Sequence, residues 1–568
     1  MLDRHLAQNG DKTAIIFEPN NPEEEEQHIT YNELHQRVCK MANVLREQGI
    51  KKGDRVCIYL PMIPELAVSI LACARIGAIH SVVFAGFSSK ALATRINDSE
   101  SKMVITSDGG YRGNKTIELK EIVDEALEKC ESVSTVLVVK RTNSAVKMKE
   151  GRDIWLQPLL DEASDNSVAE IMDAEDPLFI LYTSGSTGNP KGMVHTNAGY
   201  MVFTAYTFKN VFGYEENDIH WCTADIGWIT GHSYILYGPL LNGATTVIFE
   251  GVPSYPDYSR FWQVIEKHKV TQFYTAPTAI RALAKEKLEY VQKFPLKSLK
   301  VIGSVGEPIN EEAWHWYNDH VGGKRCPVVD TWWQTETGGI MISPLAFITP
   351  TKPTYATFPL PGIQAVLMDE KRNEIEGNQV VGSLCIKFPW PGMARTIWND
   401  HQRYKDTYFS KYPGKFFTGD GALRDEVGYY RITGRVDDVI IVSGHNLGTA
   451  PIEDAINEHP AVAESAVVGF PHDVKGNALY GYVILKETGE VRKKENLFIE
   501  INQYITDHVG PIAKLDKIQF VSGLPKTRSG KIMRRILRKI AEGNFADYGD
   551  TTTLLNPEII EEIQSGRK

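Results

Sequence analysis

Between about residues 30 and 340, amphipathic helical stretches alternate with short β-rich runs, and this alternation constrains the fold more than any other feature. Residues 31–48 have the apolar spacing of an amphipathic helix, and the β-rich runs 55–60 and 103–106 follow it. Such alternation favours parallel strand pairing, with helices covering the sheets. We therefore expect α/β layers with mainly parallel sheets in this part of the chain.

Four further β-rich runs end where a ligand site is expected. They span 178–182, 245–249, 272–275 and 301–303, and each is followed within two residues by Gly, Pro, Ser or Thr. In open α/β sheets, ligands bind beyond the carboxyl ends of the strands. These four strand ends are therefore the predicted location of a site.

After Pro391 the sequence changes to short strands and turns, at 416–420 and 429–434, before the polar run GRVDD at 434–438. We predict a large N-terminal domain, 1–436, of α/β layers with a small β-rich part, and a small α+β C-terminal domain, 437–568. The C-terminal domain is expected to hold helices at 452–459 and 495–508 and strands at 466–470 and 479–485.

Composition excludes several classes of protein. The 568 residues are 42% hydrophobic and 24% charged, as in folded globular proteins, which excludes disordered and fibrous classes. Sixty-two basic against seventy-two acidic residues give 62 − 72 = −10, which argues against a general nucleic-acid binder. The seven cysteines form no C-x-x-C pair, which argues against a disulfide framework or a zinc ribbon.

The N-terminus has no apolar segment of the kind that a secretory signal requires. The most apolar stretch, 66–87, is interrupted by Arg75, Gly77, His80 and Gly86, so it predicts a buried helix and a strand rather than a membrane span. We expect a cytoplasmic protein that binds neither membranes nor nucleic acid.

The strongest local signal is TSGSTGNPKG at 183–192, directly after the predicted strand 178–182. Its glycines and hydroxyl residues offer backbone N–H groups and side-chain donors, and Lys191 adds a charge, a combination that suits a polyphosphate. It is not a Walker motif, because Gly192 stands where Ser or Thr would follow the lysine. The alternative interpretation is a polar surface loop.

Six motifs occur in the order seen in acyl- and aryl-adenylate-forming enzymes: TSGSTGNPKG, GEP at 306–308, DTWWQTETG at 330–338, TGD at 418–420, GRVDD, and PKTRSGK at 525–531. Within that superfamily the chain closely resembles the acetyl-CoA synthetase family, from about Gly10 to Asn556. The resemblance implies that a carboxylic acid reacts with ATP to form an acyl-adenylate, which then passes its acyl group to CoA. Many relatives carry a further N-terminal element before the region of resemblance.

The resemblance identifies Lys531 as the catalytic lysine that bridges the carboxylate and α-phosphate oxygens. A carboxylate needs no general base to attack a phosphate, so the main obstacle is bringing two anions together, which a cation relieves. Lys531 is also the position at which a lysine acetyltransferase and a deacetylase act in this family, because acetylation removes its charge.

Seven basic residues lie in 526–539, and such a segment has two simpler interpretations. A solvated helix face is expected for 534–539. A nucleic-acid patch is disfavoured, because aromatic residues for base stacking are missing and the chain is acidic.

For the nucleotide, the resemblance gives Glu336 as the Mg²⁺ ligand, Asp420 as the carboxylate that accepts the ribose hydroxyls, and Arg435 as a contact to ribose or phosphate. A lone glutamate on the surface is the alternative for Glu336. The remaining ATP-binding positions are Thr183, Ser184, Gly185, Ser186, Thr187, Gly188, Lys191, Gly306, Glu307, Pro308, Asp330, Thr331, Trp332, Trp333, Gln334, Thr335 and Asn446, the last replacing a usual arginine.

Trp333 is expected to decide the acid, because its indole closes a pocket that stays open in relatives for long acids. A two- or three-carbon acid is implied. The remaining positions of the matching pocket wall are Trp228, Ile229, Thr230 and Val305. Ordinary core packing is the alternative role for a tryptophan.

For CoA, Arg112 and Lys115 match the basic pair that holds the 3′-phosphate, with Lys115 replacing a usual arginine. Ser254 replaces a common asparagine, and Thr506 replaces an arginine that touches CoA. The further CoA positions are Ala85, Gly86, Thr230, Ala276, Ser443 and Gly444.

The resemblance also implies a hinge and a metal site. Asp437 matches a hinge about which the C-terminal domain alternates between the two half-reactions, with Lys531 present for the first and Gly444 for the second. His459, with the carbonyls of Asn457 and Val462, matches a small structural metal site. A surface histidine without a metal is the alternative.

The expected function is therefore an AMP-forming acetate:CoA ligase with Mg²⁺ as cofactor and ATP and CoA as co-substrates. A propionyl-CoA synthetase would have the same fold and residues. The motifs are also compatible with an adenylation domain that loads a carrier protein. A nucleotide-binding regulator that has lost catalysis is a further candidate. The replacement of usual arginines by Asn446 and Thr506 would then be the first sign of that loss.

Overall fold

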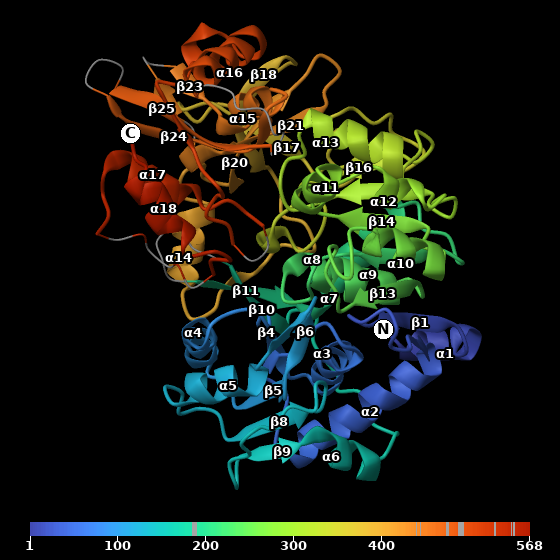
Figure 1. The fold of residues 1–568 in the computed structure, drawn as a ribbon. Helices are drawn as coiled ribbons and strands as arrows, with labels where there is room; N and C mark the ends of the chain where they lie inside the picture. The colour runs from blue at the N-terminus through green and yellow to red at the C-terminus, as the bar shows by residue number, and fades with distance from the viewer. Residues whose placement is uncertain are drawn as a thin grey trace.

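In the computed structural model of the chain, the described residues are 1–183, 190–438, 440–442, 445–472, 476–486, 494–527, 530–546, 548, 551 and 553–568. Within them, residues 437, 441, 445, 446 and 476 are described as backbone only. Figure 1 shows three regions, with the first part of the chain at one end and the last part stacked beside the middle.

The first region is built on an eight-stranded sheet, which occupies the lower half of Figure 1. Six neighbouring strands run parallel, whereas β11 and β19 are antiparallel additions at one edge. In spatial order the strands are β19 (Thr396–Ile397), β11 (Lys191–Thr196), β10 (Pro177–Thr183), β4 (Ile79–Val82), β3 (Arg55–Tyr59), β5 (Met103–Ser107), β8 (Thr135–Val139) and β9 (Asp153–Trp155). The helices that accompany it are α1 (Asp3–Asn9), α2 (Tyr31–Glu47), α3 (Pro64–Ile76), α4 (Ser89–Ser99), α5 (Leu119–Leu127) and α6 (Leu156–Glu162).

Local signals explain two of these helices. Thr30 and Glu33 form a reciprocal capping box at the start of α2, which satisfies backbone N–H groups that would otherwise lack partners. Pro64 begins α3, and Gly77 ends it in the left-handed conformation, with φ of 71°. The apolar stretch 66–87 is therefore a buried helix and a strand, as expected.

The second region is a seven-stranded sheet in which all neighbours are parallel except the edge pair β1–β2. Its order is β16 (Val328–Asp330), β15 (Val301–Ser304), β14 (Gln272–Thr275), β12 (Ile219–Cys222), β13 (Thr245–Phe249), β1 (Thr13–Glu18) and β2 (Gln27–Thr30). The helices of this region are α7 (Asn197–Val211), α8 (Ile229–Gly231), α9 (Gly238–Leu241), α10 (Arg260–His268), α11 (Pro277–Ala284), α12 (Glu289–Gln292) and α13 (Glu311–Trp316). The expected α/β class with mainly parallel sheets is confirmed.

The last part of the chain forms two smaller sheets. An antiparallel sheet contains β17 (Ala365–Met368), β18 (Val380–Ile386), β20 (Phe416–Arg424) and β21 (Tyr430–Arg435), and α14 (His401–Tyr408) packs against β20. A five-stranded sheet follows, with β22 (Ile440–Val442), β23 (His445–Leu447), β24 (Val462–His472), β25 (Gly476–Leu485) and β26 (Lys517–Phe520). Its helices are α15 (Thr449–Asn457), α16 (Lys494–His508), α17 (Arg534–Glu542) and α18 (Ile559–Ser565).

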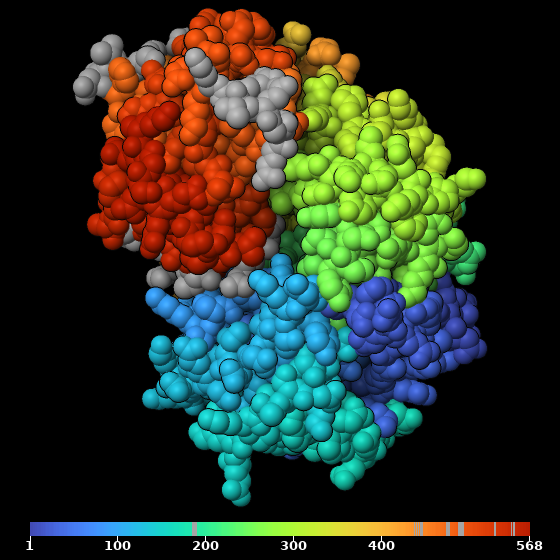
Figure 2. Space-filling view, viewed as in Figure 1, coloured from blue at the N-terminus to red at the C-terminus, as the bar shows by residue number. Residues whose placement is uncertain are grey.

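The basic segment 534–539 lies in α17, so the expected helix is confirmed. Among the described residues, no helix combines the length and apolar character that crossing a bilayer requires. Figure 2 shows the C-terminal segment, in red and orange, lying against the middle of the chain, in green. The predicted site residues come from both the C-terminal segment and the preceding part of the chain.

Candidate active site

Three parallel neighbours, β14, β15 and β16, end side by side, and the segment after β16 forms one wall of the site. Trp332 Nε1 donates a hydrogen bond to Asp420 Oδ2 over 3.0 Å. Gln334 Nε2 donates to the same oxygen over 2.7 Å and to the Thr418 carbonyl over 2.8 Å. These contacts join residues almost ninety positions apart and fix the orientation of the Asp420 carboxylate.

Arg435 lies beside Asp420 because the two residues are paired across β20 and β21. Its Nη1 lies 3.5 Å from Asp420 Oδ1 and donates to the Thr418 carbonyl over 3.2 Å. Burial raises the pKa of Asp420, and the charges of Arg435 and Lys531 only partly offset this effect. A ligand that donates hydrogen bonds would favour the charged carboxylate.

Glu336 lies in a buried polar group with Lys191 and Tyr408. Lys191 Nζ is 3.6 Å from Glu336 Oε1 and donates to the Tyr408 hydroxyl over 2.7 Å, while that hydroxyl donates to Glu336. Burial raises the pKa of Glu336, but the Lys191 charge and the Tyr408 hydrogen bond outweigh it and hold the pKa below its usual value. Glu336 is only 12% exposed, so the alternative of a surface glutamate is wrong.

His195 holds the backbone next to Glu336. Its Nε2 lies 2.8 Å from the Thr335 carbonyl, which can only accept, so this nitrogen carries the proton. Burial lowers the pKa of His195 to about 4, so the ring is neutral at pH 7. Neither His195 nor Tyr408 was predicted from the sequence; His195 follows the glycine-rich loop by a few residues, but Tyr408 belongs to no motif.

The residues fit Mg²⁺ as a partner of bound phosphates. Within the described residues, no three His, Cys, Asp or Glu side chains gather to hold a metal on their own. An ionised Glu336 is a hard oxygen ligand, and Mg²⁺ in nucleotide sites is commonly held by one or two carboxylates together with substrate phosphates.

Trp333 packs against a buried apolar cluster. Its Nε1 donates to the Tyr274 hydroxyl over 3.2 Å, and its ring meets Tyr234 edge-on at 5.0 Å between centroids. Ile229 and Val305 are buried in the same apolar cluster. Trp228 packs on a neighbouring cluster instead, against Phe84 and Phe87, and Thr230 lies in α8 directly after Ile229.

The strand ends at β15 and β16 carry the next group. Ser304 Oγ donates to Asp330, and burial raises the pKa of Asp330 to about 7. Thr331 Oγ1 lies 2.6 Å from the Tyr274 hydroxyl, which also accepts from Trp333. The GEP turn follows, with Gly306 at φ of 95° and Glu307 accepting from Thr278 and Arg281 ahead of Pro308.

Lys531 comes from the C-terminal part of the chain and lies on an exposed loop. Thr527 anchors this loop: its N–H donates to the Lys531 carbonyl over 2.8 Å, and its Oγ1 accepts from the Lys531 N–H over 3.1 Å. Gly530, at φ of 88°, lies so close to α11 that a Cβ would come within 3.0 Å of Thr278. The Lys531 loop therefore touches the residue that contacts Glu307.

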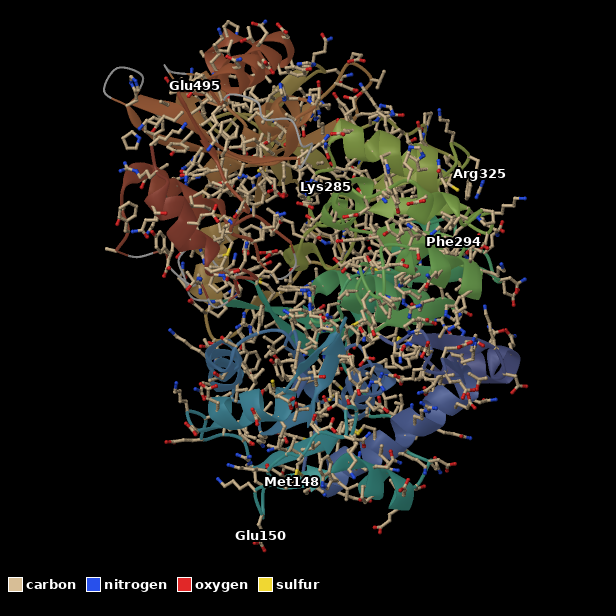
Figure 3. All side chains as sticks on the ribbon, viewed as in Figure 1. Met148, Glu150, Lys285, Phe294, Arg325 and Glu495 are labelled. Carbon is tan, nitrogen blue, oxygen red and sulfur yellow. The ribbon has the colours of Figure 1, made fainter. Side chains whose placement is uncertain are left out.

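Further contacts hold the C-terminal sheet against α11. Glu464 of β24 forms an ion pair with Lys526 at 2.7 Å and lies 4.0 Å from Arg281, which also pairs with Glu307 at 2.9 Å. Lys285, labelled in Figure 3, follows α11; burial lowers its pKa, and the Glu464 charge partly offsets this effect. A polar network thus connects the GEP turn to the domain that carries Lys531.

The basic pair expected at the CoA phosphate flanks a hairpin turn. Arg112 and Lys115 are directly paired in the short ladder of β6 (Gly110–Arg112) and β7 (Lys115–Ile117), and both are exposed. The Arg112 guanidinium lies 5.9 Å from the Phe84 ring centroid, next to Ala85 and Gly86. The turn also approaches the segment around Ser254, because a Cβ on Gly113 would lie 3.3 Å from Val252.

The remaining predicted site residues either lie away from the β6–β7 turn, are located elsewhere in the fold, or fall outside the described residues. Thr506 lies in α16, at the top of Figure 1 and away from β6, which lies near its middle, and the Thr506 hydroxyl donates to the Asn502 carbonyl. Ala276 precedes α11. Thr183 and Lys191 are paired across β10 and β11, while Ser184, Gly185, Ser186, Thr187, Gly188, Ser443 and Gly444 lie outside the described residues, and Asp437 and Asn446 are described only as backbone.

His459 is 2% exposed, so the alternative of a surface histidine is wrong. Its Nε2 lies 3.0 Å from Glu500 Oε2, and its Nδ1 accepts from the Ala461 N–H over 3.2 Å. Both ring nitrogens are therefore engaged, and a metal would have to displace one of these partners.

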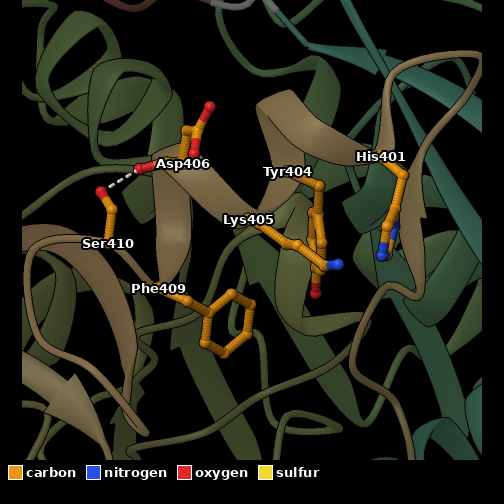
Figure 4. Close-up of a pocket in the computed structure, with 6 residues that line it drawn as sticks. All are labelled: His401, Tyr404, Lys405, Asp406, Phe409 and Ser410. Atoms are coloured by element: carbon orange, nitrogen blue, oxygen red, sulfur yellow. Dashed lines mark hydrogen bonds between the residues drawn. The ribbon is translucent and has the colours of Figure 1, made fainter.

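An open hollow of about 510 Å³ lies over α14 and the residues after it, as Figure 4 shows. Within it, Ser410 donates a hydrogen bond to the Asp406 carbonyl. The hollow is lined mainly by apolar atoms of one helix and carries none of the predicted site residues.

The sequence profile of AMP-binding enzymes matches residues 2–398, and that of the AMP-binding enzyme C-terminal domain matches 451–531. The chain is 59% identical to the acetyl-coenzyme A synthetase of Syntrophobacter fumaroxidans and 58% identical to that of Parvibaculum lavamentivorans, in each case over 100% of this chain and 87% of the relative. The acetoacetyl-CoA synthetase from Streptomyces lividans has the same fold, with a TM-score of 0.88 over 99% of this chain and 85% of that one at 23% identity. The chain therefore belongs to the AMP-binding enzymes, in the family of the acetyl-coenzyme A synthetases.

Proposed function

We propose that the protein is an AMP-forming acetate:CoA ligase. Acetate and MgATP form acetyl-AMP and pyrophosphate, and CoA then converts acetyl-AMP into acetyl-CoA and AMP. The observation that carries the choice of acid is Trp333, whose indole is held by Tyr274 and Tyr234 in the apolar cluster that also contains Ile229 and Val305. An indole fixed in this place leaves room for only a short acid.

In the first step, a carboxylate oxygen of acetate attacks the α-phosphorus of ATP, and the bond to the bridging oxygen of pyrophosphate breaks. Lys531 supplies positive charge between the two anions, and this role is supported by the neighbouring Gly530, which lies beside Thr278, and by the electrostatic effect of Lys531 on Asp420. Asp420 and Arg435 orient the ribose. Glu336 would hold Mg²⁺, which neutralises charge on the phosphates when it is bound.

In the second step, the thiol of CoA attacks the acetyl carbonyl and AMP leaves. Arg112 and Lys115 hold the 3′-phosphate of CoA, and their exposure on a hairpin turn supports binding from solvent. The C-terminal domain, 437–568, turns about Asp437 between the two steps, so that Lys531 leaves and Gly444 enters. The contact between Glu464 and Arg281 of α11 joins the two parts and belongs to the arrangement for the first step.

Two further assignments are part of the proposal. A lysine acetyltransferase silences adenylation by modifying Lys531, and a deacetylase restores it; the exposure of Lys531 supports such access. A structural metal at His459, Asn457 and Val462 would require the ring to release Glu500 or the Ala461 N–H.

The direct test is the exchange of labelled pyrophosphate into ATP, without CoA, with acids from acetate to hexanoate. Exchange with acetate or propionate alone is expected. Exchange with hexanoate as fast as with acetate would contradict the role of Trp333, and a kcat/KM for propionate at or above that for acetate would make the protein a propionate enzyme. Nucleotide binding without exchange would favour a regulator.

A further inference from the structure

Asn20 makes both of its amide hydrogen bonds to one residue of the hairpin turn that carries Arg112 and Lys115. Its Nδ2 donates to the Gly113 carbonyl over 2.8 Å, and its Oδ1 accepts from the Gly113 N–H over 2.8 Å. Gly113 lies in the two-residue turn directly after Arg112, at φ of 61°. The Asn20 side chain therefore pairs with both the N–H and the carbonyl of Gly113, as the backbone of a neighbouring strand would.

Asn20 is itself fixed in place. It is 3% exposed, and its N–H donates to Glu250 Oε2 over 3.2 Å. Arg141 binds Glu250 through two hydrogen bonds, of 2.9 and 2.6 Å, and binds Glu24 through two more, of 2.7 and 2.9 Å. The Arg141 guanidinium also lies 5.0 Å from the ring centroid of Tyr111, the residue before Arg112.

These contacts are directed at an exposed turn rather than at the core. A two-residue turn between two short strands is weakly restrained by itself, because the β6–β7 ladder has only three residue pairs. An amide carries its donor and its acceptor on two adjacent atoms, so it can pair with the N–H and the carbonyl of one residue, whereas a hydroxyl carries both functions on a single oxygen. No motif singles out Asn20, which lies more than ninety positions before the turn.

We propose that Asn20 is a positioning residue for the CoA 3′-phosphate, which acts by fixing the turn between Arg112 and Lys115. The inference rests on the proposed function and on the assignment of this basic pair. Asn20 touches no substrate. It lowers the cost of ordering two cationic side chains when the phosphate binds.

The test compares CoA with 3′-dephospho-CoA, which lacks the phosphate that the turn would hold. In Asn20→Ala, we expect the KM for CoA to rise about threefold to tenfold, as for the loss of one or two orienting hydrogen bonds. The KM for dephospho-CoA and the pyrophosphate exchange without CoA should change less than about twofold, because neither uses the turn. Asn20→Ser, which keeps a polar group in the buried position, gives the same comparison if the alanine variant fails to fold.

Asn21→Ala is the matched control, because Asn21 is exposed and its side chain accepts only a local hydrogen bond from the Glu23 N–H among those described. Its KM for CoA should stay at the wild-type value. An equal rise for CoA and dephospho-CoA in the Asn20 variants would overturn the inference, because it would indicate general loosening.

Arg112→Ala separates this inference from the proposed function. If Arg112→Ala raises the KM for CoA and the Asn20 variants do not, the role of Asn20 is wrong and the phosphate site remains. If none of the variants changes that KM, the phosphate does not bind at this turn and the inference also fails. Acetate-dependent exchange would still support the adenylation step in that case.

Discussion

The two sides of the candidate site differ in how firmly their residues are held. On one side, Trp332 and Asp420 are buried and Gln334 is half-buried, and both Trp332 and Gln334 donate hydrogen bonds to Asp420. On the other side, Lys531 is exposed on a loop that is tied by Thr527 and touches Thr278. In the proposed mechanism, the groups that recognise the nucleotide are thus preorganised, whereas the reactive charge comes from a segment that withdraws after the first step.

Lys531→Ala removes the positive charge on the C-terminal loop and leaves the contacts of Trp332 and Gln334 with Asp420 intact. We expect pyrophosphate exchange to fall by about three orders of magnitude, because the positive charge that bridges the attacking carboxylate and the α-phosphate is lost. Thioester formation from supplied acetyl-AMP should remain largely intact, measured as acetyl-CoA release. Equal loss of both steps would contradict the division between the two sides.

Asp330→Asn tests whether burial of Asp330, on the buried side of the candidate site, makes the stability of the protein depend on pH. Burial raises the pKa of Asp330 to about 7, above its value in the unfolded chain, so its neutral form stabilises the folded state at low pH. This stabilisation is lost as the pH rises from about 4 through 7, which amounts to about 2 kcal/mol between pH 5 and pH 7. Asparagine cannot ionise, so the variant should become more stable relative to wild type over this interval in urea unfolding. Parallel pH profiles for the two proteins would contradict the assignment.

Trp333→Gly opens the wall at the acid pocket. We expect the ratio of kcat/KM for hexanoate to that for acetate to rise at least about tenfold, because the space of the indole becomes available to methylenes. Trp228→Gly is a useful comparison, since Trp228 packs on a different apolar cluster. An unchanged dependence on chain length in Trp333→Gly would show that the indole only fills the core.

Glu464→Gln weakens the attachment of the Lys531 side. Glu464 lies 4.0 Å from Arg281 of α11, across the boundary between the two parts, so its neutralisation should lower the population of the adenylating arrangement and slow exchange about threefold to fivefold. Thioester formation from supplied acetyl-AMP should not fall. Glu312→Gln is the matched control, because the Glu312–Lys486 pair also joins the two parts but is far more exposed, and exposed pairs contribute little.

Several elements follow directly from local sequence. The predicted strands 245–249 and 272–275 match β13 and β14 residue for residue, because buried β-rich runs were bounded by turn residues. The strand β11 was not predicted: it follows the glycine-rich loop and pairs antiparallel with β10. The sequence of β11 shows no alternation of apolar and polar residues by which a strand could be told from a loop. Its strand conformation therefore depends on pairing with β10.

The residues that support the site were harder to predict than those that form it. Motifs led to Glu336 and Asp420, but Tyr408 and Asn20 belong to no motif, and their contacts lie 72 and 93 positions away along the chain. Such contacts depend on how helices and loops pack on the finished sheets. Local spacing carries no information about them.

The sequence by itself determined the fold class and the family, because turn residues, apolar periodicity and ordered motifs act over short distances, and the same motifs supplied the proposed site residues. Only the tertiary structure decided that Trp332 and Gln334 bind Asp420, that the Lys531 loop rests on Thr278, and that Asn20 holds the turn after Arg112. The physical reason is that each of these contacts joins elements from different sheets or loops, whose relative positions follow from strand order and core packing. The short distances and near-linear angles that these hydrogen bonds need arise only when the folded chain has brought the distant segments together.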